Sequence, residues 1–132
     1  MNLAFLIAVL IQVESGGRPG MIGDEHLSNK AYGVLQIRKP CLDDVNEVMG
    51  HELEKPLTLE DVRKSEPLSR WVCVQYLRRW GANYRRKTGK EPTYEVFSRI
   101  WNGGPNGWKK NSTLAYWSKV EVLLERTQEE GN

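Results

Sequence analysis

Residues 3–17 read LAFLIAVLIQVESGG, and this stretch decides the fold. Residues 3–11 are apolar without a break, which predicts a helix with no solvent-facing stripe, buried in the middle of a domain. The apolar run is too short to span a bilayer, which takes ~20 such residues. Gly16 and Gly17 are expected to end the helix, because glycine takes the left-handed conformation found there at little steric cost.

Glu14 lies in the last turn of this expected helix, where the chain leaves the core. A carboxyl group in such a place loses hydration, and desolvation raises its pKa toward the range of a general acid. Its negative charge also meets the negative end of the helix dipole, which costs local stability. A glutamate just before a helix-ending glycine pair is commonly just solvated. This stretch alone therefore leaves open whether Glu14 is a general acid or a solvated surface residue.

The length and composition indicate a single domain that carries both positive and negative charges. The chain has 132 residues, enough for a single core, and a formal net charge of +2. Five Trp and five Tyr offer stacking surfaces for sugar rings, although core packing is their default use. Arg78, Arg79 and residues 85–87 form a dense basic cluster, interpreted as a solvated helix face that could help the protein approach an anionic polymer. We expect no nucleic-acid partner.

The start of the chain does not read as a secretion signal. Neither Lys nor Arg precedes the apolar run and no small-x-small cleavage site follows it, so we interpret the run as mature structure. An export leader would lie upstream of Met1 or be absent. Cys41 and Cys73 could form one bridge if the protein works outside the cytosol, and the sequence leaves bridged and free thiols equally open. We expect a monomer with no stable membrane insertion.

Local signals predict a mainly α (α+β) fold, a single domain of residues 1–132 with a central buried helix and a short β-hairpin. Residues 21–37 have a polar centre between two apolar ends, which favours a hairpin with its tip near Ser28 and Asn29. Four further helical segments follow it: one from Pro40 to Gly50, a short one capped by Thr58 and Asp61, one from Pro67 to about Lys87, and one from Pro92 to Trp101.

A last helix is expected to begin at a cap on Asn111 or Ser112. Its apolar positions predict an inward face made of Leu114, Trp117, Val120 and Leu124. The chain has two histidines, and no pattern of Cys or carboxylates completes a metal site around them. No serine lies in a GxSxG elbow, which disfavours a serine nucleophile. We therefore expect no metal and no cofactor.

Three segments carry a resemblance that covers most of the chain: ESGG at 14–17, AYGVLQI at 31–37 and IWNGGP at 100–105. In order and spacing they resemble the signatures of the lysozyme-like lytic transglycosylase and goose-type lysozyme family, which are usually written ES, GLMQ or GPLQI, and aromatic-Asn-x-Gly. The resemblance implies that Glu14 is the catalytic acid and that Gln36 lines the sugar cleft. It also implies that Trp101 and Asn102 approach the acid and the substrate.

Asp24 departs from the pattern of the single-carboxylate transglycosylases. It follows Gly23 on the expected hairpin, ten residues after Glu14, which looks more like the lysozymes with a second carboxylate on the β segment, including the invertebrate type. If Asp24 is a nucleophile or base, the enzyme hydrolyses its substrate. If Asp24 is an Asx-turn residue, Glu14 acts as acid and then as base toward the sugar's C6 hydroxyl, and the product is an anhydro sugar.

The resulting expectation is a muramidase that cleaves the β-1,4 glycosidic bond of peptidoglycan, with chitin-like chains as the second choice of substrate. Ser28 and Tyr32 are further candidates for the cleft. A lytic transglycosylase and a non-catalytic glycan-binding module are the alternatives, and a helical nucleic-acid-binding domain is disfavoured by the near-neutral charge. The expected location is extracytoplasmic: secreted, periplasmic or phage-delivered.

Overall fold

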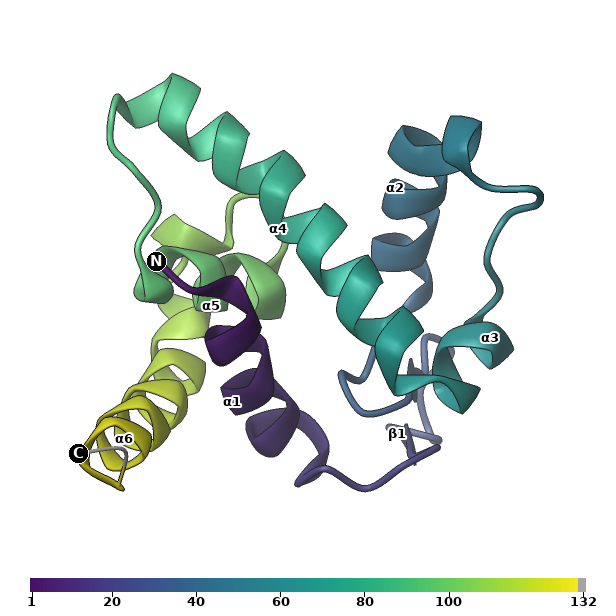
Figure 1. The fold of residues 1–132 in the computed structure, drawn as a ribbon, viewed down its shortest axis with the longest axis horizontal. Helices are drawn as coiled ribbons and strands as arrows, with labels where there is room; N and C mark the ends of the chain where they lie inside the picture. The colour runs from purple at the N-terminus through teal and green to yellow at the C-terminus, as the bar shows by residue number, and fades with distance from the viewer. Residues whose placement is uncertain (131–132) are drawn as a thin grey trace. The chain divides into compact units, whose positions relative to one another are not determined.

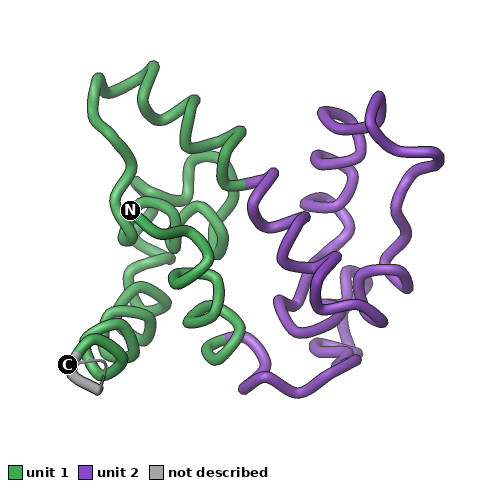
Figure 2. The backbone as a smooth tube through the Cα atoms, viewed as in Figure 1, with its two compact units in different colours: residues 1–13, 77–132 green, residues 14–76 purple. Residues whose placement is uncertain are grey.

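The structure is a computed structural model that describes residues 1–130 (Figure 1). It is mainly helical with one two-stranded antiparallel sheet, which confirms the predicted fold class. The chain divides into two compact units (Figure 2): residues 1–13 with 77–132, called unit 1, and residues 14–76, called unit 2. The assignment of all 132 residues to one domain stays a prediction.

The helices and strands follow the order expected from the sequence. They are α1 (Leu3–Ser15), β1 (Ile22–Gly23), β2 (Ala31–Tyr32), α2 (Lys39–Met49), η1 (Gly50–Glu52), α3 (Leu59–Lys64), α4 (Glu66–Thr88), α5 (Tyr94–Gly103), η2 (Gly107–Lys109), η3 (Asn111–Thr113) and α6 (Leu114–Glu130), where η marks a 3-10 helix. Among residues 1–130, no helix is both long enough and apolar enough to cross a membrane.

Helix α1 is largely buried, as its apolar run predicts. The buried side chains of this helix are those of Leu6, Ile7, Val9, Leu10 and Ile11. Ala4, Ala8 and Gln12, however, are exposed along one line of the helix. The prediction that α1 has no solvent-facing stripe is therefore wrong, because alanine is small enough to face water at little cost in exposed apolar area.

The hairpin and the short capped helix of unit 2 are also confirmed. Ile22 pairs with Tyr32 and Gly23 pairs with Ala31, which leaves residues 24–30 as the loop between the strands. At the start of α3, the Thr58 side chain accepts a hydrogen bond from the Asp61 N–H, and the Asp61 carboxylate accepts one from the Thr58 N–H. The core of this unit consists of Ala31, Val34, Leu35, Ile37, Leu42, Val45, Val62, Val72, Cys73 and Tyr76.

In unit 1, α5 packs against α6 and against both 3-10 helices, η2 and η3. Val120 and Leu124 are buried, as predicted for the last helix. Leu114 is 44% exposed and does not face inward, so that prediction is wrong. The residue before it, Thr113, is 1% exposed because its hydroxyl is hydrogen bonded inside the unit, and Leu114 consequently turns outward.

Candidate active site

Glu14 occupies the last turn of α1, one residue before the end of the helix. The helix ends at two glycines with positive φ, Gly16 at +66° and Gly17 at +80°. The Glu14 side chain is partly buried. Burial raises the pKa of the Cys73 thiol, and the charges of Cys41 and Glu14 raise it further. The carboxyl group of Glu14 is thus close enough to α4 for its charge to act on Cys73.

Ser15 fastens the end of α1 to the segment after the hairpin. Its side chain is buried, and its hydroxyl donates a hydrogen bond to the Val34 carbonyl oxygen at 2.8 Å. The same hydroxyl accepts a hydrogen bond from the Gly17 N–H at 3.1 Å. Ser15 was not among the predicted site residues, although it is the second letter of the ES signature. Its pairing with Val34 joins the first signature segment to the second.

Residues 32–37 form a tight turn that carries the second signature segment. Tyr32 and Ile37 exchange two backbone hydrogen bonds, each 2.9 Å long, across this turn. Gly33 has a φ of +80°, and a Cβ atom there would lie 2.9 Å from the Val62 carbonyl oxygen. The turn therefore requires glycine at position 33 for both its conformation and its packing.

Gln36 holds the hairpin and this turn together. Its φ is +51°, in the left-handed region, and its side-chain amide donates to the Gly33 carbonyl oxygen at 2.9 Å and to the Met21 carbonyl oxygen at 3.4 Å. A Cβ atom at Gly23 would come within 2.0 Å of the Gln36 side-chain oxygen. The amide group thus has a structural use in the turn, and the contact of Gln36 with sugar stays a prediction.

Asp24 begins the hairpin loop and is paired with Arg38. Its φ is +53°, and its carboxylate accepts a hydrogen bond from the Arg38 guanidinium in an exposed ion pair. This hydrogen bond is the main reason that the pKa of the Asp24 carboxyl is lowered. Arg38 also donates to the Asn29 carbonyl oxygen, so it connects both ends of the loop. Asp24 is ionised at neutral pH, as an aspartate of ordinary pKa also is, and the ion pair moves its pKa further below that range.

Arg38 is a residue that the sequence reasoning missed. The available signal was its position directly after Ile37, whose backbone pairs with Tyr32 in the hairpin. A cation at that position is placed beside the loop that carries Asp24. Of the other two predicted residues on the hairpin, Ser28 lies exposed in the loop and Tyr32 is partly buried in β2.

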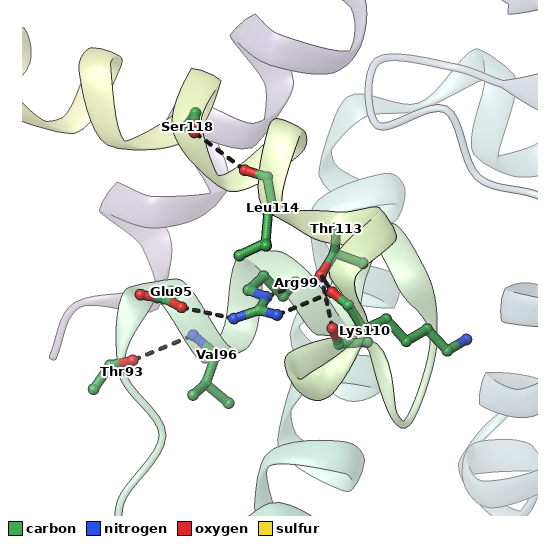
Figure 3. A network of polar contacts seen from close by, with 9 residues as sticks. Thr93, Glu95, Val96, Arg99, Lys110, Thr113, Leu114 and Ser118 are labelled. Carbon is green, nitrogen blue, oxygen red and sulfur yellow. Dashed lines mark hydrogen bonds and ion pairs between the residues drawn. The ribbon is translucent and has the colours of Figure 1, made fainter.

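Trp101 and Asn102 lie near the C-terminal end of α5, in unit 1. Trp101 is partly buried and Asn102 is exposed. The segment that follows them is held by Arg99, whose side chain is 11% exposed (Figure 3). The guanidinium group donates to the Glu95 carboxylate at 2.8 Å, to the Thr113 hydroxyl at 2.9 Å and to the Lys110 carbonyl oxygen at 2.9 Å.

Two glycines allow the η2 and η3 turns to approach α5 this closely. A Cβ atom at Gly107 would lie 2.0 Å from the Arg99 carbonyl oxygen, and one at Gly103 would lie 2.4 Å from the Thr113 methyl group. The third signature segment is therefore held in place within unit 1 by the partly buried Arg99 and by two positions without side chains.

The predicted site residues fall into two groups. Glu14, Asp24, Ser28, Tyr32 and Gln36 belong to unit 2, whereas Trp101 and Asn102 belong to unit 1. Their meeting in one cleft stays a prediction. Unit 2 also has a cavity of about 240 Å³, which contains none of these residues and is lined by Pro19, Gly20, Val34, Arg63, Lys64 and Glu66.

Clusters of His, Cys, Asp and Glu side chains are the usual metal ligands in proteins. Within residues 1–130, no group of three or more His, Cys, Asp or Glu side chains could hold a metal ion. Both cysteines are free thiols, Cys41 partly exposed and Cys73 buried, and desolvation by burial raises the pKa of each. A carboxyl group at the end of a buried helix and a second, ionised carboxylate on a hairpin are groups of the type that acid–base chemistry uses.

Comparison with known proteins identifies relatives of the chain, although no family model matches it. A lysozyme of Magallana gigas is 32% identical over 113 residues, which is 84% of this chain and 72% of that protein. An invertebrate-type lysozyme of Ruditapes philippinarum is 28% identical over 115 residues, covering 86% and 76% of the two chains. Lysozyme 1 of Crassostrea virginica is 41% identical over 50 residues, which is 38% of this chain and 26% of that protein.

Two solved structures share the fold. The Tapes japonica lysozyme superposes with a TM-score of 0.67 at 25% identity, covering 87% of this chain and 85% of its own. The structure of Meretrix lusoria lysozyme in complex with Aeromonas hydrophila PliI gives a TM-score of 0.69 at 22% identity, covering 89% and 86%.

Proposed function

The chain belongs to the invertebrate-type lysozyme family, a family of glycosidases, and from this premise we propose that it is a muramidase with Glu14 as its general acid. The bond cleaved is the β-1,4 glycosidic bond of peptidoglycan. The observation that carries the proposal is the position of Glu14 in the last turn of α1, beside Ser15, whose hydroxyl is bonded to the second signature segment. A catalytic acid requires a fixed support of this kind, because a small misplacement costs much of the rate.

The proposed mechanism divides the work between two carboxyl groups. The glycosidic oxygen needs a proton as it leaves, and Glu14 supplies it. The developing positive charge on the sugar needs a nucleophile, or a base that activates water. Asp24 suits this second role because it is an ionised carboxylate on the hairpin, and Arg38 lowers the pKa of its carboxyl below the ordinary value. The two groups differ in environment, which is the usual way that one site holds an acid and a base at the same pH.

A lytic transglycosylase is the second candidate function, and the Asp24–Arg38 ion pair favours it. A carboxylate that is engaged by a guanidinium is a weaker nucleophile and base than a free one. Glu14 would then act alone, first as acid and afterwards as base toward the C6 hydroxyl of the same sugar. The product would be an anhydro sugar instead of a reducing end.

The proposed substrate is the glycan strand of peptidoglycan, with chitin-like chains as the second choice. This polymer lies outside the cytoplasm, so the proposed site of action is extracytoplasmic, and the proposed working form is a monomer. The residues proposed to bind sugar are Ser28, Tyr32 and Gln36 from unit 2 and Trp101 and Asn102 from unit 1.

The first experiment tests the acid. Glu14→Gln should keep the thermal unfolding midpoint and the binding of peptidoglycan while lowering turnover by at least ~100-fold, the lower end of the usual scale for a general acid. Glu54→Gln is the matched control, because Glu54 is an exposed glutamate of the same unit and the chemical change is identical. Near-normal turnover by the Glu14 variant would overturn the proposal. A wild-type protein that binds the polymer without any turnover would be a glycan-binding module.

The second experiment separates the two reactions. Asp24→Asn should lower the rate of hydrolysis by ~100-fold or more if Asp24 is the second catalytic group. Mass spectrometry of the products from purified cell wall distinguishes water-added ends from anhydro ends. An Asp24→Asn variant that stays active and releases anhydro sugars would assign the chemistry to Glu14 alone.

A further inference from the structure

Unit 2 has a charged cavity that the proposed catalytic groups do not use, and we call it the unit 2 cavity. It has a volume of about 240 Å³ and lies where α3 ends and α4 begins, against the segment that follows α1. Pockets for drug-sized ligands have about 300–1,000 Å³, so this cavity suits a smaller group of roughly one or two amino-acid residues. Its lining combines three uncharged residues with three charged side chains: Pro19, Gly20, Val34, Arg63, Lys64 and Glu66.

Two of the charged side chains are held in place by their neighbours. Arg63 donates from Nε to the Glu60 carboxylate at 2.7 Å and from Nη1 to the Gly20 carbonyl oxygen at 3.5 Å. The Glu66 carboxylate accepts a hydrogen bond from Arg70 at 3.1 Å. A guanidinium has several N–H donors and a carboxylate has several lone pairs, so both groups are oriented and still have capacity to bind a ligand.

Helix stability accounts for the signs of the charges but not for the cavity between them. Lys64 lies in the last turn of α3 and Glu66 in the first turn of α4, where helix dipoles favour a cation and an anion respectively. Lys64 is exposed, and among residues 1–130 its ammonium takes part in no hydrogen bond or ion pair. An uncommitted ammonium and an oriented carboxylate on one cavity wall suit a ligand that carries both a carboxylate and an ammonium or N–H group.

The unit 2 cavity adjoins the support of Glu14. Val34 lines the cavity, and its carbonyl oxygen accepts the 2.8 Å hydrogen bond from Ser15, the residue after Glu14. Gly20 follows Glu14 by six residues, so it lies within roughly 20 Å of it, at ~3.3–3.6 Å per residue. A peptide of about five residues reaches roughly 17 Å on the same scale. A peptide attached to a sugar near Glu14 thus has the length to enter the cavity.

We propose that the unit 2 cavity binds the charged peptide that branches from the glycan strand of peptidoglycan, and so makes the enzyme prefer this polymer to chitin. The identity of the polymer rests on the proposed function, whereas the charges of the cavity carry the choice of ligand class. Lys64 and Arg63 bind a carboxylate of the peptide, and Glu66 accepts from an ammonium or N–H group. Chitin has no charged branch to bind these side chains.

The test compares two double variants with identical chemical changes. Lys64→Met/Glu66→Gln removes both charges from the cavity, and Lys55→Met/Glu54→Gln removes two exposed charges elsewhere in the same unit. Both leave the net charge unchanged, and both lysines lower the pKa of Asp61, so the control matches in that respect as well. Thermal midpoints show whether each variant keeps its fold. If the cavity variant unfolds early, Lys64→Met against Lys55→Met repeats the comparison, because the Lys64 ammonium has no partner among residues 1–130.

The kinetic readout is kcat/KM on two substrates: soluble peptidoglycan strands with their peptides, and the same strands after an amidase has removed the peptides. The ratio of the first value to the second should fall about 5-fold in the cavity variant, which is the scale of one partly exposed charge pair. The control should keep the wild-type ratio. An unchanged ratio in the cavity variant, or equal falls in both variants, would overturn the proposal.

A binding measurement is independent of turnover. The synthetic peptide L-Ala-γ-D-Glu-L-Lys-D-Ala-D-Ala, at millimolar concentration, should shift the NMR signals of the Gly20 and Val34 amides in the wild-type protein more than in the cavity variant. The same peptide with its carboxylates amidated should shift them less. Absence of any shift in the wild-type protein would refute the assignment of the cavity. A wild-type protein that binds this peptide but cleaves neither substrate would instead overturn the proposed function and leave that assignment intact.

Discussion

Replacing Ser15 by alanine removes the link between the end of α1 and the Val34 segment. Ser15 is 2% exposed, Val34 is 3% exposed, and the hydrogen bond between them is 2.8 Å long. The substitution leaves the Val34 carbonyl oxygen without this donor and the Gly17 N–H without its acceptor. A net hydrogen bond contributes about 1 kcal/mol and an unsatisfied buried group costs about 1–3 kcal/mol, so the free energy of unfolding should fall by about 2 kcal/mol.

Urea unfolding followed by circular dichroism measures this loss, and Ser118→Ala provides the control. The Ser118 hydroxyl also donates to a carbonyl oxygen, that of Leu114 at 3.2 Å, but on an exposed face of α6. Its removal should change the free energy of unfolding by less than about 0.5 kcal/mol. If Ser15→Ala costs no more than Ser118→Ala, the reasoning that burial makes the Ser15 bond important is refuted.

Two further predictions concern a close backbone contact and an ion pair. Gly107→Ala should lower the free energy of unfolding by about 3 kcal/mol in the same urea-unfolding assay, because its Cβ atom would lie 2.0 Å from the Arg99 carbonyl oxygen. Gly50→Ala is the control: its Cβ atom would have no atom within 4 Å, so the free energy of unfolding should stay the same or rise. Arg38→Gln should raise the pKa of the Asp24 carboxyl toward its ordinary value of about 4, as measured by NMR titration, and an unchanged value would contradict the pairing. Because the folded-state pKa is lowered, the contribution of this pair to stability is present above about pH 4 and is lost as pH falls through the folded-state value.

The features that sequence predicts well are those whose causes are local. The capping box at Thr58 and Asp61 is complete within four residues, and the hairpin follows from one polar segment between two apolar ends. Helix α1 was predicted as buried because its apolar run is long, but its exposed line was missed because Ala4 and Ala8 count as apolar while costing little in water.

The features that sequence could not supply depend on contacts between distant residues. Leu114 has the right spacing for an inward face, yet the direction of that turn is decided by Thr113, whose hydroxyl is bonded to Arg99 fourteen residues earlier. The pairing of Asp24 with Arg38 also spans fourteen residues. No local sequence pattern predicts either pairing. The first pairing accompanies the outward direction of Leu114, and the second lowers the pKa of Asp24.

The contact between Gln36 and Gly23 has a consequence for how the sequence can change over evolution. A Cβ atom at position 23 would meet the Gln36 side-chain oxygen at 2.0 Å, so the end of the Gln36 side chain would have to move and would lose its hydrogen bonds to the Met21 and Gly33 carbonyl oxygens. A non-glycine residue with φ of +51° also carries backbone strain of about 1 kcal/mol or more, which glycine at position 36 would relieve. Loss of the glutamine should therefore make larger residues acceptable at position 23, and the two positions should vary together among descendants of this sequence. The hairpin is in this sense an epistatic unit, in which the first substitution decides whether the second is tolerated.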